Sequence, residues 1–130
     1  MRLLLDTQVW LWMVAAPARL SEAGRSLLTA ADNELLLSAA SAWEITIKYG
    51  LGKLELPEAP AAYIPRLMAR AGITPLPILH RHALHVASLP LHHRDPFDRL
   101  LVAQAQLEEL PILTADPAFG LYAVTVLAAQ

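Results

Sequence analysis

A short apolar run at the start of the chain constrains the fold most. Leu3, Leu4 and Leu5 are followed directly by Asp6 and Thr7, and a helix-like pattern comes next. Such a run predicts a buried strand whose last residue emerges at the edge of a sheet. Because open α/β sheets bind ligands just beyond the carboxyl ends of their strands, we expect Asp6 at a functional position.

The same arrangement returns near the other end of the chain. Ile112 and Leu113 lead into Thr114 and, after one alanine, Asp116, which stands before Pro117 and taken alone favours a turn cap. Further strands are expected at residues 34–38, 73–79 and 124–127, the second at a sheet edge because it holds two prolines. Helices are expected to begin near residues 8, 22, 38 or 41, 57, 80 and 96.

This alternation of strands and helices predicts an α/β fold with a mostly parallel sheet and helices on both faces. The 130 residues contain no linker, repeat or low-complexity tract, so we expect one domain covering residues 1–130.

Glu44 lies in the helix expected from Ser38 or Ser41 onward. Its spacing from Ser41 is that of a capping box, in which the glutamate would satisfy an amide at the helix start. The local sequence leaves this structural interpretation and a functional one equally open.

The segment 93–105 contains the densest signal. Asp95, followed by Pro96 and an apolar helical pattern, is a natural N-cap, which makes Pro96 the first helical residue and Asp98 the third. Both acids then lie at the positive end of a helix. For Asp95 we favour the capping role, and for Asp98, which is free to point across the sheet edge, a functional one.

Five histidines occur between residues 80 and 93, at positions 80, 82, 85, 92 and 93. The chain has no cysteine, and their spacing matches no recognised zinc site. A solvated helix face is therefore favoured over a zinc site for this set.

Considered together, four acids can converge on one rim of the sheet: Asp6, Glu44, Asp98 and Asp116. Four carboxylates in one place repel and resist ionisation unless a cation neutralises them. Oxygen ligands select a hard ion such as Mg²⁺ or Mn²⁺, and such a centre suits hydrolysis of a phosphodiester bond.

The net charge of −2 provides no general attraction for nucleic acid, so binding would depend on bound metal or local positive charge. Candidates for guiding an RNA backbone are Lys48, Lys53, Arg94 and Arg99. A hydrophobic fraction of 55% predicts a partner chain, a homodimer, or both.

The absence of cysteine fits a reducing cytoplasm. The first 18 residues imitate a signal peptide, but Asp6 and Gln8 interrupt the apolar region, and we expect the segment to be retained. The apolar runs are too short for a membrane span.

Four segments together resemble PIN-domain ribonucleases of the VapC toxin type: Leu3–Thr7, Ser38–Ile45, Arg94–Arg99 and Leu113–Asp116. The resemblance covers essentially the whole chain. It implies a PIN-like three-layer α/β/α sandwich with short strands and a Mg²⁺- or Mn²⁺-dependent endoribonuclease. It also implies the toxin of a bacterial toxin–antitoxin pair, usually dimeric and held inactive by a small antitoxin.

The resemblance also implies roles for particular residues. The acidic cluster would comprise the four acids named above, with Asp6 and Asp98 as the principal metal ligands, and Thr7 and Thr114 would orient ligands or water. Asp95 is an additional acid outside the general PIN pattern.

Two other functions compete with this one. A phosphatase with an aspartate nucleophile needs a second acid where Gln8 stands, and a phosphoacceptor domain needs a late lysine, whereas none follows Lys53. A non-catalytic module would use its apolar surface to dock a partner while the acids only cap helices and turns.

Overall fold

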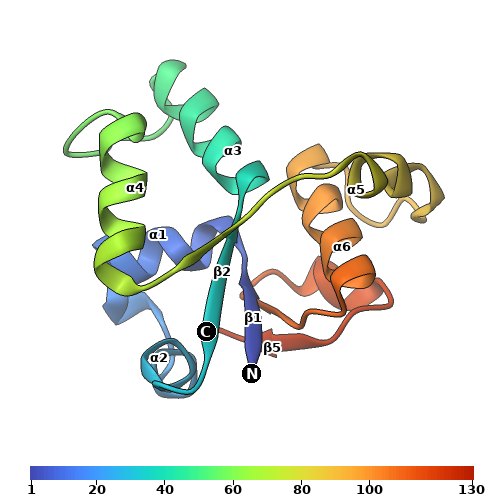
Figure 1. Ribbon diagram of the computed structural model, residues 1–130, viewed down its shortest axis with the longest axis horizontal. Helices are drawn as coiled ribbons and strands as arrows, with labels where there is room; N and C mark the ends of the chain where they lie inside the picture. Colours follow the sequence, from blue (N-terminus) through green and yellow to red (C-terminus); the bar gives the residue numbers. More distant parts are fainter.

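A five-stranded parallel sheet forms the centre of the computed structural model, which describes residues 1–130 (Figure 1). Its strands are β1 (Arg2–Leu5), β2 (Glu34–Ser38), β3 (Thr74–Leu76), β4 (Ile112–Thr114) and β5 (Val126–Ala128). They lie in the order β3-β2-β1-β4-β5, and every neighbouring pair is parallel. The predicted parallel sheet is confirmed, and so is the edge position of the proline-rich β3.

Six α-helices and three short 3₁₀ helices connect the strands. The α-helices are α1 (Thr7–Ala15), α2 (Glu22–Thr29), α3 (Ala39–Gly50), α4 (Pro60–Ala71), α5 (His80–His85) and α6 (Pro96–Glu108). The 3₁₀ helices are η1 (Pro17–Arg19), η2 (Val86–Ser88) and η3 (Pro117–Leu121). None of the helices combines the length and hydropathy needed to cross a membrane.

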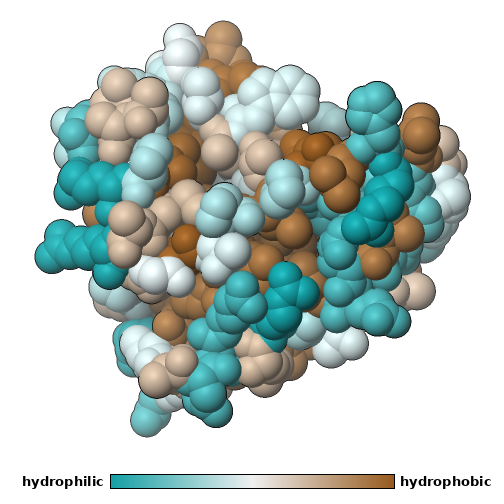
Figure 2. Space-filling view, in the orientation of Figure 1, coloured by the Kyte–Doolittle hydropathy of each residue, from teal (hydrophilic) through white to brown (hydrophobic).

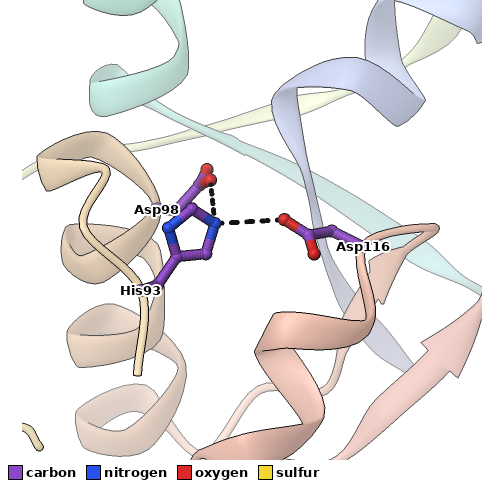
Figure 3. A group of neighbouring side chains, drawn as sticks. All are labelled: His93, Asp98 and Asp116. Atoms are coloured by element: carbon purple, nitrogen blue, oxygen red, sulfur yellow. Dashed lines mark hydrogen bonds and ion pairs between the residues drawn. The ribbon is translucent and has the colours of Figure 1, made fainter. Parts of the chain in front are cut away.

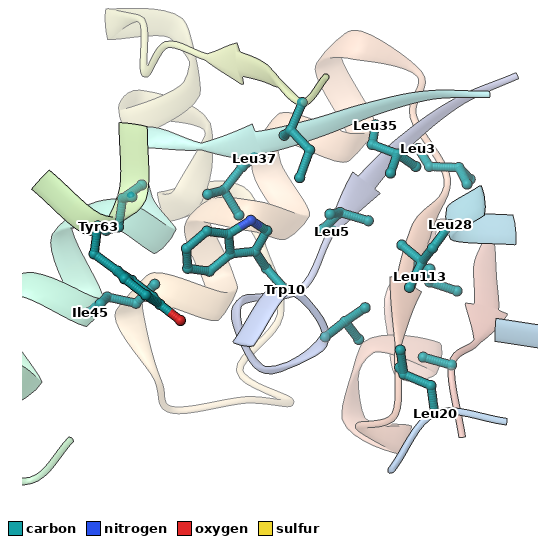
Figure 4. Packing of buried hydrophobic residues seen from close by; sticks show 14 residues of the cluster. Leu3, Leu5, Trp10, Leu20, Leu28, Leu35, Leu37, Ile45, Tyr63 and Leu113 are labelled. Carbon is teal, nitrogen blue, oxygen red and sulfur yellow. The ribbon is translucent and has the colours of Figure 1, made fainter. Parts of the chain in front are cut away.

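The alternating side chains of β1 divide the core between the two faces of the sheet. Leu3 and Leu5 pack with α1–α4, where buried Trp10 meets Tyr63 edge-on at a centroid distance of 6.2 Å (Figure 4). Leu4 packs on the opposite face with α6 and with Phe119 of η3. The result is the expected three-layer α/β/α sandwich, with one apolar cluster on each side of the sheet.

Two sequence interpretations are wrong. The capping box from Ser41 to Glu44 does not form, because α3 begins earlier and Ser38 Oγ accepts the cap hydrogen bond from the Ala40 amide at 3.0 Å. The histidines do not form a solvated face, because His82 is fully buried.

Apolar side chains nevertheless remain on the surface. Trp43 and Ile47 on α3 and its C-cap residue Leu51 follow one stripe, and Trp43 is 57% exposed. An almost wholly apolar hollow of about 500 Å³ lies between β2, β3, α3 and α4 and includes Ile64 and Met68. Figure 2 shows apolar atoms in the middle of one face, between more polar margins.

Candidate metal centre

One cavity of about 490 Å³ collects all four predicted acids, Asp6, Glu44, Asp98 and Asp116. The sheet topology explains the convergence, because β1 and β4 are parallel neighbours and their carboxyl ends meet at one edge. Each acid comes from a different element: the end of β1, the second turn of α3, the first turn of α6, and the loop after β4. The predicted convergence on one rim is confirmed.

Asp6 is 6% exposed and is held by its neighbour on β4. Thr114 Oγ1 donates a 2.8 Å hydrogen bond to Asp6 Oδ2 and accepts the Asp116 amide at 2.9 Å. Thr114 therefore links the two acids that follow strands. Thr7, the other predicted polar residue, donates to Ser41 Oγ at 2.8 Å and joins the start of α1 to α3.

Glu44 is 5% exposed, and its two carboxylate oxygens have different surroundings. Oε2 lies 2.5 Å from Lys48 Nζ, one turn later on α3, and this hydrogen bond raises the pKa of Lys48. Oε1 is buried and has no hydrogen-bond partner. A buried carboxylate oxygen without a partner is costly, and a bound cation would offset that cost.

The start of α6 holds Asp95 and Asp98 in different roles. Asp95 Oδ1 accepts the amides of Phe97 and Asp98 at 2.8 and 3.3 Å, which confirms the predicted N-cap. Asp98 faces the cavity, and its Oδ2 lies 2.9 Å from His93 Nε2 (Figure 3). The same His93 nitrogen hydrogen-bonds Asp116 Oδ2 at 3.0 Å.

Asp116 has both of the roles that the sequence suggests, a turn cap and a member of the acidic cluster. Its Oδ1 accepts the Ala118 amide at 2.9 Å and caps η3, while its Oδ2 faces His93. A capping bond through one oxygen leaves the other available to the cavity.

Crowding and burial oppose ionisation of the two central acids. Burial, and secondarily Glu44, raise the pKa of Asp6 to about 6, although the Thr114 hydrogen bond works in the other direction. Burial raises the pKa of Asp98 to about 8, with further repulsion from Asp6 and Asp95. Both groups lack a positive partner strong enough to offset their neighbours.

These residues fit a hard divalent cation. The cavity offers carboxylate oxygens, its acids repel one another, and Glu44 Oε1 lacks a partner. Divalent ions such as Mg²⁺ and Mn²⁺ favour such oxygen ligands, and their charge would relieve the repulsion.

The PIN domain model matches residues 3–124, a span that contains all four acids. The chain belongs to the PIN domain family.

Ribonuclease VapC16 of Mycobacterium tuberculosis is 51% identical to this PIN domain over 61 residues. That match covers 47% of this chain and 43% of the relative, so the chain spans less than half of the relative's length.

Two solved structures share the fold over nearly the whole chain. VapBC2 from Rickettsia felis, bound to a DNA fragment from the promoter, superposes with a TM-score of 0.75 at 15% identity, covering 100% of both chains. DNA-bound VapBC from Salmonella typhimurium gives a TM-score of 0.70 at 16% identity, covering 98% of both. At these identities the likeness concerns the PIN fold.

The four basic residues predicted to guide RNA lie in different settings. Lys48 and Lys53 line the acidic cavity, whereas Arg94 is exposed and is not part of its lining. Arg99 is bonded to its own chain: its guanidinium donates to the carbonyls of residues 86, 89 and 90 and to the Tyr122 hydroxyl. These contacts occupy both terminal nitrogens of Arg99, which is not part of the cavity lining.

His93 is the residue of this PIN site that the sequence interpretation missed. It was grouped with the other histidines, but its ring lies between Asp98 and Asp116. Its position two residues before the helix cap was the available signal, because a side chain there can fold back onto the first turn of the helix.

Proposed function

We propose that this PIN domain is a Mg²⁺- or Mn²⁺-dependent endoribonuclease. The observation that supports it most is the meeting of four carboxylates from four elements in one cavity, with one buried Glu44 oxygen unpartnered. A bound divalent ion would lower the pKa of an attacking water and stabilise negative charge on the phosphate.

The chain's own residues then have distinct tasks. Asp6 and Asp98 are the principal metal ligands, and Glu44 and Asp116 complete the acidic set. Thr114 fixes the Asp6 carboxylate through its 2.8 Å hydrogen bond, and Thr7 holds the start of α1 against α3. Asp95 acts through the backbone, since its cap sets the first turn of α6 from which Asp98 projects.

The RNA backbone would be guided mainly by Lys53, which lines the cavity without an ion-pair partner. Lys48 contributes positive charge beside Glu44, and exposed Arg94 directly precedes Asp95 in the chain. These charges are local, which is what a chain with a net charge of −2 requires to bind a polyanion.

We further propose that the chain is the toxin of a toxin–antitoxin pair and acts in the cytoplasm. The similarity to Ribonuclease VapC16 and to the chains of two VapBC complexes supports this role. The exposed α3 stripe of Trp43, Ile47 and Leu51 provides apolar surface for a small antitoxin, a second copy of the chain, or both.

The test is cleavage of defined tRNAs and rRNA by the purified chain with Mg²⁺ or Mn²⁺, with and without chelator. Asp6→Asn and Asp98→Asn should each lower the rate by at least about 100-fold, since each removes a charged ligand. Asp32→Asn, a change at an exposed acid in the turn before β2, is the matched control and should leave the rate unchanged.

Full cleavage by both site variants would refute the proposed function. If instead the folded chain binds no Mn²⁺ at millimolar concentration, the partner-binding module becomes the better account of the acids.

A further inference from the structure

His93 is the one histidine whose ring contacts the carboxylates of the acidic site. Its Nε2 lies 2.9 Å from Asp98 Oδ2 and 3.0 Å from Asp116 Oδ2 (Figure 3). The three side chains offer ligand atoms within 4.8 Å of one another, an arrangement that can hold a metal ion. A histidine in this position is either a metal ligand or a hydrogen-bond donor, and the two roles predict different chemistry.

The other ring nitrogen decides between them. His93 Nδ1 accepts a hydrogen bond from the Asp95 backbone amide at 3.1 Å. A backbone N–H can only donate, so Nδ1 carries a lone pair and the ring proton resides on Nε2. A histidine that binds a metal through Nε2 normally carries its proton on Nδ1 and donates it to a partner, which is the opposite arrangement.

The loop that carries His93 is fixed independently of the acids. The Tyr122 hydroxyl accepts the backbone amides of His92 and His93 at 3.2 and 2.9 Å. The His93 ring also packs against Phe119 at a centroid distance of 6.1 Å. The ring is thereby held in place between α6 and the loop after β4 by contacts that need no ion.

We propose that His93 is a positioning residue, and not a metal ligand, for the acidic site. Its Nε2–H holds the Asp116 carboxylate by a hydrogen bond and lies against that of Asp98, so that acids from two separate elements stay close together. This inference rests on the proposed metal-dependent function for its catalytic consequence, but the tautomer and the metal affinity can be measured without any activity.

Three variants separate the roles. In His93→Gln, the side-chain amide nitrogen can reach the place of Nε2 and still donate a hydrogen bond. In His93→Asn, the shorter amide can accept the Asp95 N–H but cannot reach the carboxylates. His92→Asn is the matched control, because His92 is exposed and makes no side-chain hydrogen bond to the acids.

The first measurement is long-range ¹H–¹⁵N NMR of the metal-free protein, with the His93 signals assigned by their loss in His93→Asn. We expect the ring proton on Nε2. A proton on Nδ1 alone would overturn the proposal.

The second measurement is Mn²⁺ affinity, followed by pulsed EPR of the Mn²⁺-loaded chain. His93→Asn should weaken binding about 10–100-fold, while His93→Gln and His92→Asn should stay within about threefold of the unchanged protein. Direct ¹⁴N coupling from a ring bound to Mn²⁺ would overturn the proposal, and so would equal losses in the Gln and Asn variants.

Kinetics on RNA provide the third measurement. His93→Asn should lower kcat with little change in KM, and His93→Gln should restore most of kcat. If the unchanged protein binds Mn²⁺ but cleaves no RNA, the proposed function fails, whereas the tautomer and affinity results still decide the role of His93.

Discussion

Two histidines in this molecule make the same pattern of hydrogen bonds, but the carboxylates that they contact have opposite electrostatic surroundings. His82, at the start of α5, accepts the Leu79 amide through Nδ1 at 2.9 Å and meets Glu108 through Nε2 at 2.8 Å. His93, before α6, accepts the Asp95 amide through Nδ1 and meets Asp98 and Asp116 through Nε2.

The carboxylates that they meet differ. Glu108 has an additional partner in Arg81, and its pKa is lowered first by the hydrogen bond from His82 and also by the positive charge of Arg81. Asp98 is surrounded by other acids, and burial and their repulsion raise its pKa to about 8. A balanced pair stabilises the packing of α5 on α6, whereas an unbalanced cluster retains the capacity to bind a cation.

The largest difference between the two regions should appear in Mn²⁺ binding when one carboxylate of each region is neutralised. Asp98→Asn should weaken Mn²⁺ binding by at least about 100-fold, because it removes a ligand, whereas Glu108→Gln should leave binding unchanged. Calorimetric titration with Mn²⁺ measures both, and a similar loss in the two variants would remove the distinction between the two regions.

Truncating the two histidines should affect the free energy of unfolding in the opposite order, with the larger loss at His82. His82→Ala should lower the free energy of unfolding by about 2–4 kcal/mol, because it leaves a cavity and an unpaired Leu79 amide beside α6. His93→Ala should cost less, since its ring is only partly buried. Urea denaturation of the two metal-free variants tests this order, and an equal or larger loss for His93→Ala would contradict it.

The stability of the metal-free protein should fall as the pH rises above the ordinary carboxyl pKa of 3.8, and the loss should be complete near pH 6 for Asp6 and near pH 8 for Asp98, their pKa values in the folded state. A carboxyl group with a raised pKa in the folded state stabilises the fold while protonated, and that contribution is lost on ionisation. Asp98→Asn should therefore raise the free energy of unfolding at pH 8 by about 1–3 kcal/mol. Thermal unfolding in chelator measures it, and a lower stability of the variant at pH 8 would show that burial and repulsion do not penalise the ionised Asp98 carboxylate.

Glu108 should show the opposite pH dependence. Its pKa is lowered in the folded state, so its contribution to stability is present at neutral pH and is lost as the pH falls below 4.5 through the folded-state value. Glu108→Gln should slightly lower the thermal midpoint at pH 7, and the difference should be smaller at pH 3. A constant difference at both pH values would indicate lost packing instead of a lost charge pair.

The smallest effect concerns Lys53. Lys53→Gln should weaken RNA binding a few-fold and reduce the slope of log affinity against log salt by about 0.7, the value for one phosphate contact on a single strand. Arg81→Gln removes an equal charge from the Glu108 region and is the control. Equal slopes for Lys53→Gln and the unchanged protein would exclude Lys53 from the RNA path.

Local rules predicted the elements and most of the caps. Leucine runs marked β1 and β2, Ser21 caps α2 by accepting the Gly24 amide, and Asp95 caps α6 as its place before Pro96 indicated. These features depend on residues a few positions apart, which the order of amino acids records directly.

Other features depended on which elements pack together. Ser38 and not Ser41 begins α3, because β2 ends there and the chain turns at once into the helix. His82 is buried because α5 lies on α6, where Glu108 meets it. Arg99 is bonded to its own chain because the loop over residues 86–90 folds back beside α6.

The sequence by itself determined the parallel sheet, its edge strand and the four acids that follow strands or begin helices, because alternation and residue type carry that information. Only the tertiary structure decided that one buried Glu44 oxygen has no hydrogen-bond partner, that Thr114 holds Asp6, and that His93 lies between two acids from different elements. The contacts of Thr114 with Asp6 and of His93 with Asp116 join residues 108 and 23 positions apart, and the burial of the Glu44 oxygen is recorded by no local pattern.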